Sequence, residues 1–551
     1  MLGQRSAQRG MFEADTWCGD FVGRRNFYGF LASQRDELFR DEDFAGLYCR
    51  NNGRPSVPPS LLATALVLQA YDGVSDDEAK QSADYDLRWK VALGIELDVR
   101  PFAKSTLQEF RAQLIVHEQT LAIFQRSLEV AKRRGVWKKG HPQHERQQMK
   151  LALDTTHILG RGAVKDTYNL LADGIVQVLR VLAKLGPFEL TDVAEALDCA
   201  RYVCGPSLKG QADVDWTNSQ ARQRFLAEIV ADADQLLDVV RGTRVGLVED
   251  SAADKELIAA AGVLARILGQ DIERREDGPR LKQGVAPDRL ISVHDPEMRH
   301  GRKSSSHRFN GHKAQVAVDT DSQLITAVDV LPGNVADADH ALEVVEASET
   351  ATECAAVEVM GDCAYGAGAT RAEFAASGRT LVAKVPEMHN QEFYAKTAFE
   401  IDLEAGTCTC PAKQETRDLR PAKGGGGTFV FATATCAACP LRAQCTRGQG
   451  GRTVQLHPQE ALLQQARELQ ASPAFDELRQ RRQVVEHRIA RLVQLGIRQA
   501  RYFGRTKTLF QLGLAAAVAN LTLLAATSGA LSEAVRMVLA GPWSFWRSWW
   551  A

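Results

Sequence analysis

The sequence predicts a mixed α/β fold in which strands are separated by long helical stretches. Short apolar runs at Met149–Leu153 and Val357–Met360 have the composition of buried strands. Two further runs at 312–320 and 323–331 have the residue pattern of strands, and the link between them is short enough for a hairpin. Because 551 residues are too many for one compact core, we expect two to four domains.

The composition is that of a globular protein, with 45% hydrophobic and 25% charged residues. The formal net charge of −2 gives no sign of a nucleic-acid partner, but local charge does. Arg479–Lys507 contains nine Lys or Arg and one acid, and Arg126–Lys150 contains eight against two. Most basic runs are only solvated faces. A basic run around a candidate metal ligand is better interpreted as a phosphate-binding surface.

Residues 1 to about 135 are predicted to form several short helices. A periodic run opens after Pro58 and ends at Gly73, and Ser75 has the position of a cap for the next helix. A third helix ends at Gly94 and a fourth starts near Ser105. This pattern fits a helix-turn-helix-like bundle that binds DNA, and it fits a plain helical bundle as well.

The first apolar strand is expected to end at Asp154, and a helical insert follows it from about residue 165 to about 285. The insert leans acidic, so we do not expect it to line DNA. Residues 278–284 are predicted to close it as a loop. Helices are predicted at 170–185, 193–200, 221–241 and 254–268.

The second apolar strand ends in a turn that carries Asp362, with Gly361 predicted to allow a tight bend. A carboxylate at a strand end is well placed to hold a metal ion, although most Gly-Asp turns are structural. Asp154 has a similar local position, and Glu486 is the one acid of the helical, arginine-rich stretch 479–491. Glu477 lies before the dense arginine run and is a weaker candidate.

A group of five cysteines lies between about residues 400 and 455. Cys436 and Cys439 have the spacing of two zinc ligands, and Cys410 and Cys445 would complete a set of four, leaving out Cys408. Reduced cysteines without a metal, or redox chemistry, are the open alternatives. The eleven cysteines and the absence of a secretory signal favour a reducing cytosol.

Leu509–Thr527 has nineteen residues without a charge, and its polar residues favour a buried core helix over a membrane span. We therefore expect no membrane partner. Residues 528–551 form a Trp-rich tail. The tail is predicted to serve packing or self-association, or to have no role.

Two strand aspartates followed by a helical glutamate match the metal-binding trio of ribonuclease-H-like nucleases and transposases. The chain resembles a bacterial insertion-sequence transposase with a DDE catalytic domain, of the insertion-sequence 1182 type, related to the insertion-sequence 4/5 superfamily. Asp295–Arg299 and Arg308–Lys313 resemble stretches that precede the second strand in this family.

The family's glutamate signature matches this chain at Arg482 and Glu486 only. Arg479 and Val493 occupy the positions where the family has a tyrosine and a lysine. The ordered set of motifs, which spans most of residues 25–525, carries the resemblance.

The resemblance implies a helical DNA-binding domain at 1–140 and an RNase-H-like catalytic domain at 141–527, with the helical and the zinc-ribbon-like inserts inside it and the tail after it. Asp154, Asp362 and Glu486 would hold two Mg²⁺ ions about 3.5–4 Å apart, with Mn²⁺ able to replace them. Arg482 would neutralise a phosphate near the scissile bond.

The implied activity is cleavage of double-stranded DNA at the terminal inverted repeats of the element, followed by strand transfer into target DNA. The implied partners are these DNAs and a second copy of the chain in a synaptic homodimer, in the bacterial cytoplasm at the nucleoid. An alternative is a zinc-containing DNA-binding protein, derived from a transposase, that does not cleave.

Overall fold

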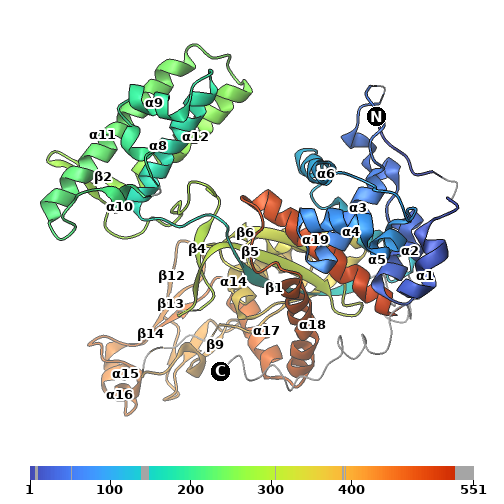
Figure 1. Cartoon of the computed structure of the whole chain (residues 1–551). Coiled ribbons are helices and arrows are strands. Elements are labelled where there is room, and N and C mark those ends of the chain that lie inside the picture. Colours follow the sequence, from blue (N-terminus) through green and yellow to red (C-terminus); the bar gives the residue numbers. More distant parts are fainter. Residues whose placement is uncertain are drawn as a thin grey trace.

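The computed structural model describes residues 1–6, 10–50, 52–137, 148–205, 207–304, 306–386, 390 and 392–527. The described chain has the mixed α/β composition that the sequence predicts. A central sheet is flanked by the N-terminal helices, while a helical insert and a cysteine-rich region extend from it on the other side (Figure 1). Two predicted segments lie outside the described residues: the Trp-rich tail, and residues 138–147 of the basic run Arg126–Lys150.

The N-terminal part is helical, as predicted. Gly73 and Gly94 end their helices in the left-handed conformation, with φ of 70° and 62°. Ser75 forms a capping box with Glu78. The helices are α1 (Ala14–Val22), α2 (Phe27–Leu38), α3 (Pro59–Asp72), α4 (Asp76–Tyr85), α5 (Leu87–Leu93), α6 (Lys104–Val116) and α7 (Ala122–Arg133).

The main sheet has six strands in the order β4-β5-β1-β7-β8, with β6 also paired to β5. β5 runs antiparallel to β1 and forms the predicted hairpin with β6, whereas β7 runs parallel to β1 and to β8. The sequence did not predict β4, which is short and has no apolar run. The strands are β1 (Gln148–Leu159), β4 (Arg299–Arg302), β5 (Arg308–Asp319), β6 (Ile325–Pro332), β7 (Ala355–Met360) and β8 (Thr380–Val382).

The predicted end of the first strand at Asp154 is wrong, because β1 continues to Leu159. The apolar pattern stops at Leu153, but Thr155, Thr156 and Ile158 are β-branched residues that favour extended backbone. These residues pair in register with β5, which carries the strand five residues past Asp154.

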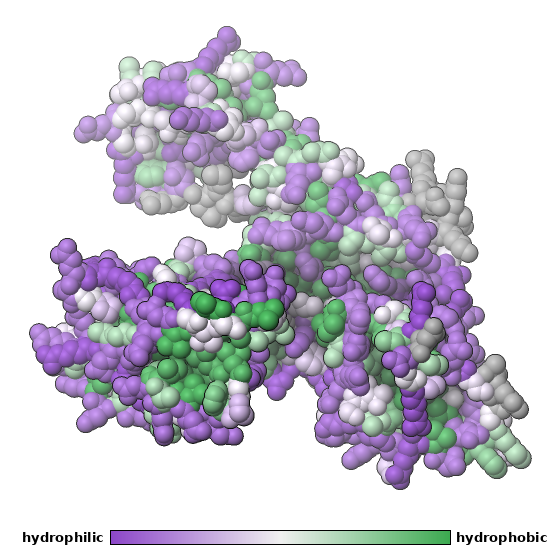
Figure 2. Space-filling view, turned by 90° about the horizontal axis from the view of Figure 1, so that it is seen from above, coloured by the Kyte–Doolittle hydropathy of each residue, from purple (hydrophilic) through white to green (hydrophobic). Residues whose placement is uncertain are grey.

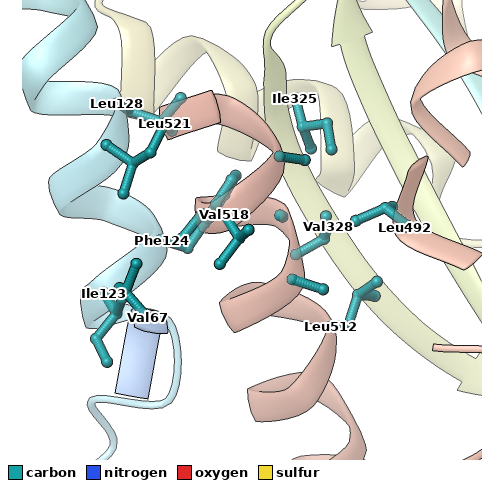
Figure 3. Close-up of a cluster of buried hydrophobic side chains, with 14 of the residues drawn as sticks. Val67, Ile123, Phe124, Leu128, Ile325, Val328, Leu492, Leu512, Val518 and Leu521 are labelled. Carbon is teal, nitrogen blue, oxygen red and sulfur yellow. The ribbon is translucent and has the colours of Figure 1, made fainter. Parts of the chain in front are cut away.

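A helix near the C-terminus, α19 (Arg505–Thr527), joins the N-terminal helices to the sheet. Its buried side chains pack against α3 and α7 on one side and against β6 on the other (Figure 3). Asn520, which is fully buried, accepts a hydrogen bond from the backbone N–H of Ile325 (2.9 Å) and donates one to its carbonyl (2.8 Å). Residues 27–137 therefore share one hydrophobic core with the sheet.

In the part of the chain that the structure describes, α19 is also the one helix long and apolar enough to cross a membrane by length and composition. Inside this fold 83% of its apolar window is buried. That burial supports the prediction of a core helix.

The helical insert has a hydrophobic core of its own and stands apart from the main body (Figure 1). Figure 2, which looks down on the insert, shows hydrophobic residues gathered on its exposed face. The predicted loop at 278–284 is wrong in its first half, because β2 (Ile272–Arg275) and β3 (Gly278–Leu281) form a hairpin that lacks the apolar alternation of a typical strand pair. The insert contains α8 (Thr167–Lys184), α9 (Leu190–Ala196), α10 (Leu208–Gln211), α11 (Ser219–Arg244) and α12 (Ala252–Asp271).

The cysteine-rich region folds into two small three-stranded sheets, β11-β10-β9 and β12-β13-β14, with two short helices. Its elements are β9 (Glu400–Asp402), β10 (Thr407–Thr409), β11 (Glu415–Thr416), β12 (Leu419–Pro421), β13 (Gly427–Val430), α15 (Thr433–Ala437), α16 (Arg442–Cys445) and β14 (Thr453–Leu456). The remaining helices are α13 (Ala341–Thr352), α14 (Gly368–Ala376), α17 (Glu460–Ala471) and α18 (Ala474–Gln494).

Candidate active site

The register of β1 against β7 determines where the two candidate aspartates lie. The last parallel pair is Ala152 with Met360, and Asp154 and Asp362 each follow two residues later. Since side chains alternate along a strand, both aspartates continue the face set by that pair. The sheet thus brings the carboxylates of Asp154 and Asp362 to the same level of neighbouring strands.

Close packing at the end of β7 fixes the backbone of Asp362. A Cβ atom on Gly361 would lie 2.7 Å from the Cβ and ring of Tyr365, which is fully buried. Position 361 therefore requires glycine because a side chain there would clash with Tyr365. The backbone conformation is not the reason, since Gly361 does not have a positive φ. Asp362 caps the turn that follows, because its Oδ1 accepts a hydrogen bond from Ala364 N at 2.8 Å.

Helix α18 brings the third candidate acid to the sheet. It packs on β1 and β5, and Arg482 and Glu486 lie four residues apart on one of its faces. Arg482 Nη1 lies 3.4 Å from Asp154 Oδ2, and the same guanidinium forms an ion pair with Glu486. Glu477 instead forms an exposed pair with Arg481 at 2.9 Å. The geometry favours Glu486 over Glu477 as the partner of Asp154.

The carboxylates repel one another across this site. Burial raises the pKa of Asp154 to about 6, Arg482 and the Thr155 backbone N–H oppose that rise, and the charges of Asp362 and Glu486 add to it. An acid whose pKa is raised in the folded protein is one that the fold does not stabilise as an anion. The site therefore has too little positive charge to balance its carboxylates.

Three carboxylates are the donor set that hard divalent cations such as Mg²⁺ prefer, so the chemistry of these residues fits the implied metal. Among the residues that the structure describes, however, no group of three or more His, Cys, Asp or Glu side chains is placed to hold a metal ion. The Arg482 guanidinium bonds to both Asp154 and Glu486. Metal binding would require Arg482 to release at least one of these two acids.

The cysteine-rich region brings four of its cysteines to one small cavity. Cys410, Cys436, Cys439 and Cys445 line a cavity of about 30 Å³, whereas Cys408 is fully buried in the core of the region. Within the described chain these thiols do not form a group placed to hold a metal, so the structure does not support the zinc prediction.

One residue near the carboxylates, Arg498, was not predicted from the sequence to belong to the site. Beyond the end of β7, the segment that follows α18 runs along the free edge of β1. Leu159 N donates to Arg498 O at 2.9 Å, and Ala500 N donates to Leu159 O at 2.8 Å. Arg498 then points back along the strand to Thr156 and His157. Arg498 belongs to the basic run 479–507, but only the fold shows that its side chain contacts β1 two and three residues beyond Asp154.

The raised pKa of Asp154 leads to a test of stability. Its unfolded value is near 3.8 and its folded value about 6, so the native state binds this proton more tightly. Stability due to this group therefore falls as pH rises from about 4 to about 6, and the full penalty remains above that range. Without divalent metal, the free energy of unfolding of Asp154→Asn at pH 7.5 should exceed that of the wild type by on the order of 2 kcal/mol, which would appear as a higher unfolding temperature.

The difference between these two proteins should vanish near pH 4. Glu477→Gln, which removes an exposed charge, is the control and should change the midpoint little. Added Mn²⁺ should stabilise the wild type and not the Asn variant. A variant less stable than the wild type at pH 7.5 would contradict the electrostatic account.

The zinc prediction can be tested by elemental analysis. If the four-cysteine cavity binds zinc in solution, the purified protein should hold about one zinc per chain. Cys439→Ser should then lose it, while Cys204→Ser, an exposed cysteine of the insert, should keep it. Folded protein that contains no zinc after purification without chelators would contradict the prediction.

Comparison with known proteins gives two family matches in separate parts of the chain. A model described as a transposase DDE domain matches residues 409–525, which include α18 with Arg482 and Glu486. A model described as a transposase domain (DUF772) matches residues 18–113 in the N-terminal helices. No curated protein and no solved structure matches. Together, the two matches support the interpretation of this chain as an insertion-sequence transposase.

Proposed function

We propose that this protein is a DNA transposase that cleaves DNA at the ends of its insertion sequence and joins those ends to target DNA. The observation that carries the proposal is the shared level of Asp154 and Asp362, with Glu486 linked to Asp154 through Arg482. The sheet order supports an RNase-H-like catalytic domain, because β1 has antiparallel β5 and β6 on one side and parallel β7 and β8 on the other. The insertion-sequence 1182 type rests on the resemblance of the sequence motifs.

The proposed chemistry is two phosphoryl transfers. In the first, the oxygen of water bonds to phosphorus as the bond to the 3′ oxygen breaks, leaving a 3′-hydroxyl and a 5′-phosphate. In the second, that 3′-hydroxyl attacks a phosphodiester of target DNA, and one phosphorus–oxygen bond replaces another. The number of phosphodiester bonds does not change in the second transfer, so it needs no ATP.

Asp154, Asp362 and Glu486 would hold Mg²⁺, as two ions with Mn²⁺ able to replace them. When bound, the metal supplies activation of the attacking oxygen and stabilisation of the leaving oxygen. Arg482, once released from the carboxylates, would be free to pair with a DNA phosphate. The position of Arg482 on α18, with Nη1 3.4 Å from Asp154 Oδ2, keeps the guanidinium close to the proposed scissile bond.

We further propose that the N-terminal helices bind the terminal repeats, that two copies act together in a synaptic complex, and that the protein works in the cytoplasm at the nucleoid. The match of residues 18–113 to a transposase domain supports the first part. Because these helices share a core with the sheet through α19, DNA binding should be measured on the full chain.

The second candidate function is a zinc-containing DNA-binding protein, derived from a transposase, that does not cleave. On that account Asp154, Asp362 and Glu486 would be structural. The raised pKa of Asp154 argues against a purely structural role, because the site costs stability at neutral pH.

The cleavage proposal is tested by replacing each carboxylate with its neutral amide. The substrate is a plasmid that carries the coding sequence with its flanking genomic DNA on both sides, and strand breaks at the element ends are measured with Mg²⁺. Asp154→Asn, Asp362→Asn and Glu486→Gln should each lower the rate by at least about 100-fold, because each removes a metal ligand. Glu477→Gln, on the same helix, should cleave as the wild type does.

Two outcomes would change the account. An active Glu486→Gln beside an inactive Glu477→Gln would move the third acid to Glu477. Normal cleavage by Asp154→Asn would overturn the proposed active site, and the absence of cleavage by the wild type under these conditions would favour the DNA-binding alternative.

A further inference from the structure

We propose that Arg498, with Lys303 beside it and His157 orienting it, forms a phosphate-binding subsite next to the carboxylates. It would hold a neighbouring phosphate of the DNA strand that is being cut. This inference rests on the proposed function and extends it, because it names residues that position the strand and take no part in holding metal.

The edge of β1 explains the location of the subsite. β7 pairs with β1 only as far as Ala152, while β1 continues to Leu159. The segment around Arg498 occupies the edge that β7 leaves open, with Gln499 forming a parallel bridge to Leu159. Asp362 and Arg498 therefore follow one another along the same edge of the strand that carries Asp154.

Hydrogen bonds to β1 fix the direction of the Arg498 side chain. Its Nη1 donates to Thr156 Oγ1 at 3.0 Å and to the carbonyl of His157 at 2.7 Å. It also lies 2.9 Å from His157 Nδ1. Thr156 and Asp154 are two residues apart on one face, a separation of about 7 Å along the strand. The guanidinium is thus anchored close to the proposed scissile position.

All three of these partners are neutral. Burial and the neighbouring cations lower the pKa of His157 to about 4, so its ring is uncharged at neutral pH and Nδ1 can accept from Arg498. No carboxylate in the described part of the chain lies within ion-pair distance of Arg498, and burial is the one cause of its lowered pKa. A half-buried guanidinium in this setting retains the capacity to bind an anion.

A second cation comes from the turn between β4 and β5. Lys303 lies within electrostatic range of both Arg498 and Asp154, and burial and Arg498 together lower its pKa. His307 in the same turn packs beside His157, with ring centroids 5.5 Å apart. Arg498 and Lys303 carry like charges on neighbouring elements, so both would attract an anion bound there.

A DNA strand is the anion that fits this arrangement. It carries successive phosphates, and a strand whose scissile phosphate meets Asp154 and Asp362 would present the next ones along the edge of β1. Carboxylates followed by cations along one edge would hold the strand in a single register. We therefore assign Arg498 as a positioning residue for the strand.

The experiment compares Arg498→Ala with Arg501→Ala in the full-length protein. Arg501 lies on the same segment, is exposed and is turned to Val74, so the control removes the same charge without touching β1. The end-bearing duplex is prepared with a single methylphosphonate, which is uncharged, at each phosphate in turn around the cleavage site. Cleavage rates and the salt dependence of binding are measured for each protein.

The wild type and Arg501→Ala should both lose cleavage, by about 10-fold or more, at one methylphosphonate next to the scissile phosphate. Arg498→Ala should cleave the unmodified duplex about 10-fold or more slowly and lose no further rate at that position, since the partner of that phosphate is already gone. Its salt slope of binding should fall by about one relative to Arg501→Ala. Arg498→Lys should restore part of the rate.

The proposal is overturned if Arg498→Ala keeps full sensitivity at every methylphosphonate position, or if its salt slope equals that of Arg501→Ala. Should Arg498→Ala not fold, Lys303→Ala, an exposed substitution, decides by the same two readouts. Failure of the proposed function is distinguishable, because it would show as normal cleavage by Asp154→Asn.

Discussion

The parallel pairing of β1 with β7 is the constraint on which the rest of the site depends. Its register places Asp154 and Asp362 at one level, although they come from distant parts of the chain. Because β7 ends early, β1 has a free edge that receives the segment after α18. The same pairing therefore positions the carboxylates and leaves room for the cation that follows them.

The electrostatic balance of the site explains why it suits a transient partner. Burial and two neighbouring acids leave Asp154 with a raised pKa, and Arg482 is the internal cation that compensates in part. A fold optimised for stability alone would not gather three acids and then hold one arginine between two of them. This loss of stability has a function if a divalent cation and a DNA phosphate replace the internal ion pairs. The metal would then bind the carboxylates, and the phosphate would pair with Arg482.

Local signals in the sequence were enough for much of the fold. The cap at Ser75, the glycines at Gly73 and Gly94 and the hairpin of β5 with β6 were predictable because each depends on a few consecutive residues. The length of β1 was not, since it is sustained by pairing with β5 and not by an apolar run. Arg498 was missed for a related reason: its contacts with Thr156 and His157, just beyond Asp154 on β1, are tertiary contacts, which no local spacing in the sequence predicts.

The central claim is that Asp154, Asp362 and Glu486 form one divalent-metal site. Anomalous scattering from crystals grown with Mn²⁺, with and without a short DNA duplex, tests it most directly. The account predicts manganese bound between Asp154 and Asp362, with Glu486 turned toward it and Arg482 released from at least one of its two acids. Manganese bound elsewhere, or an unbroken Asp154–Arg482–Glu486 network at saturating Mn²⁺ and DNA, would contradict it.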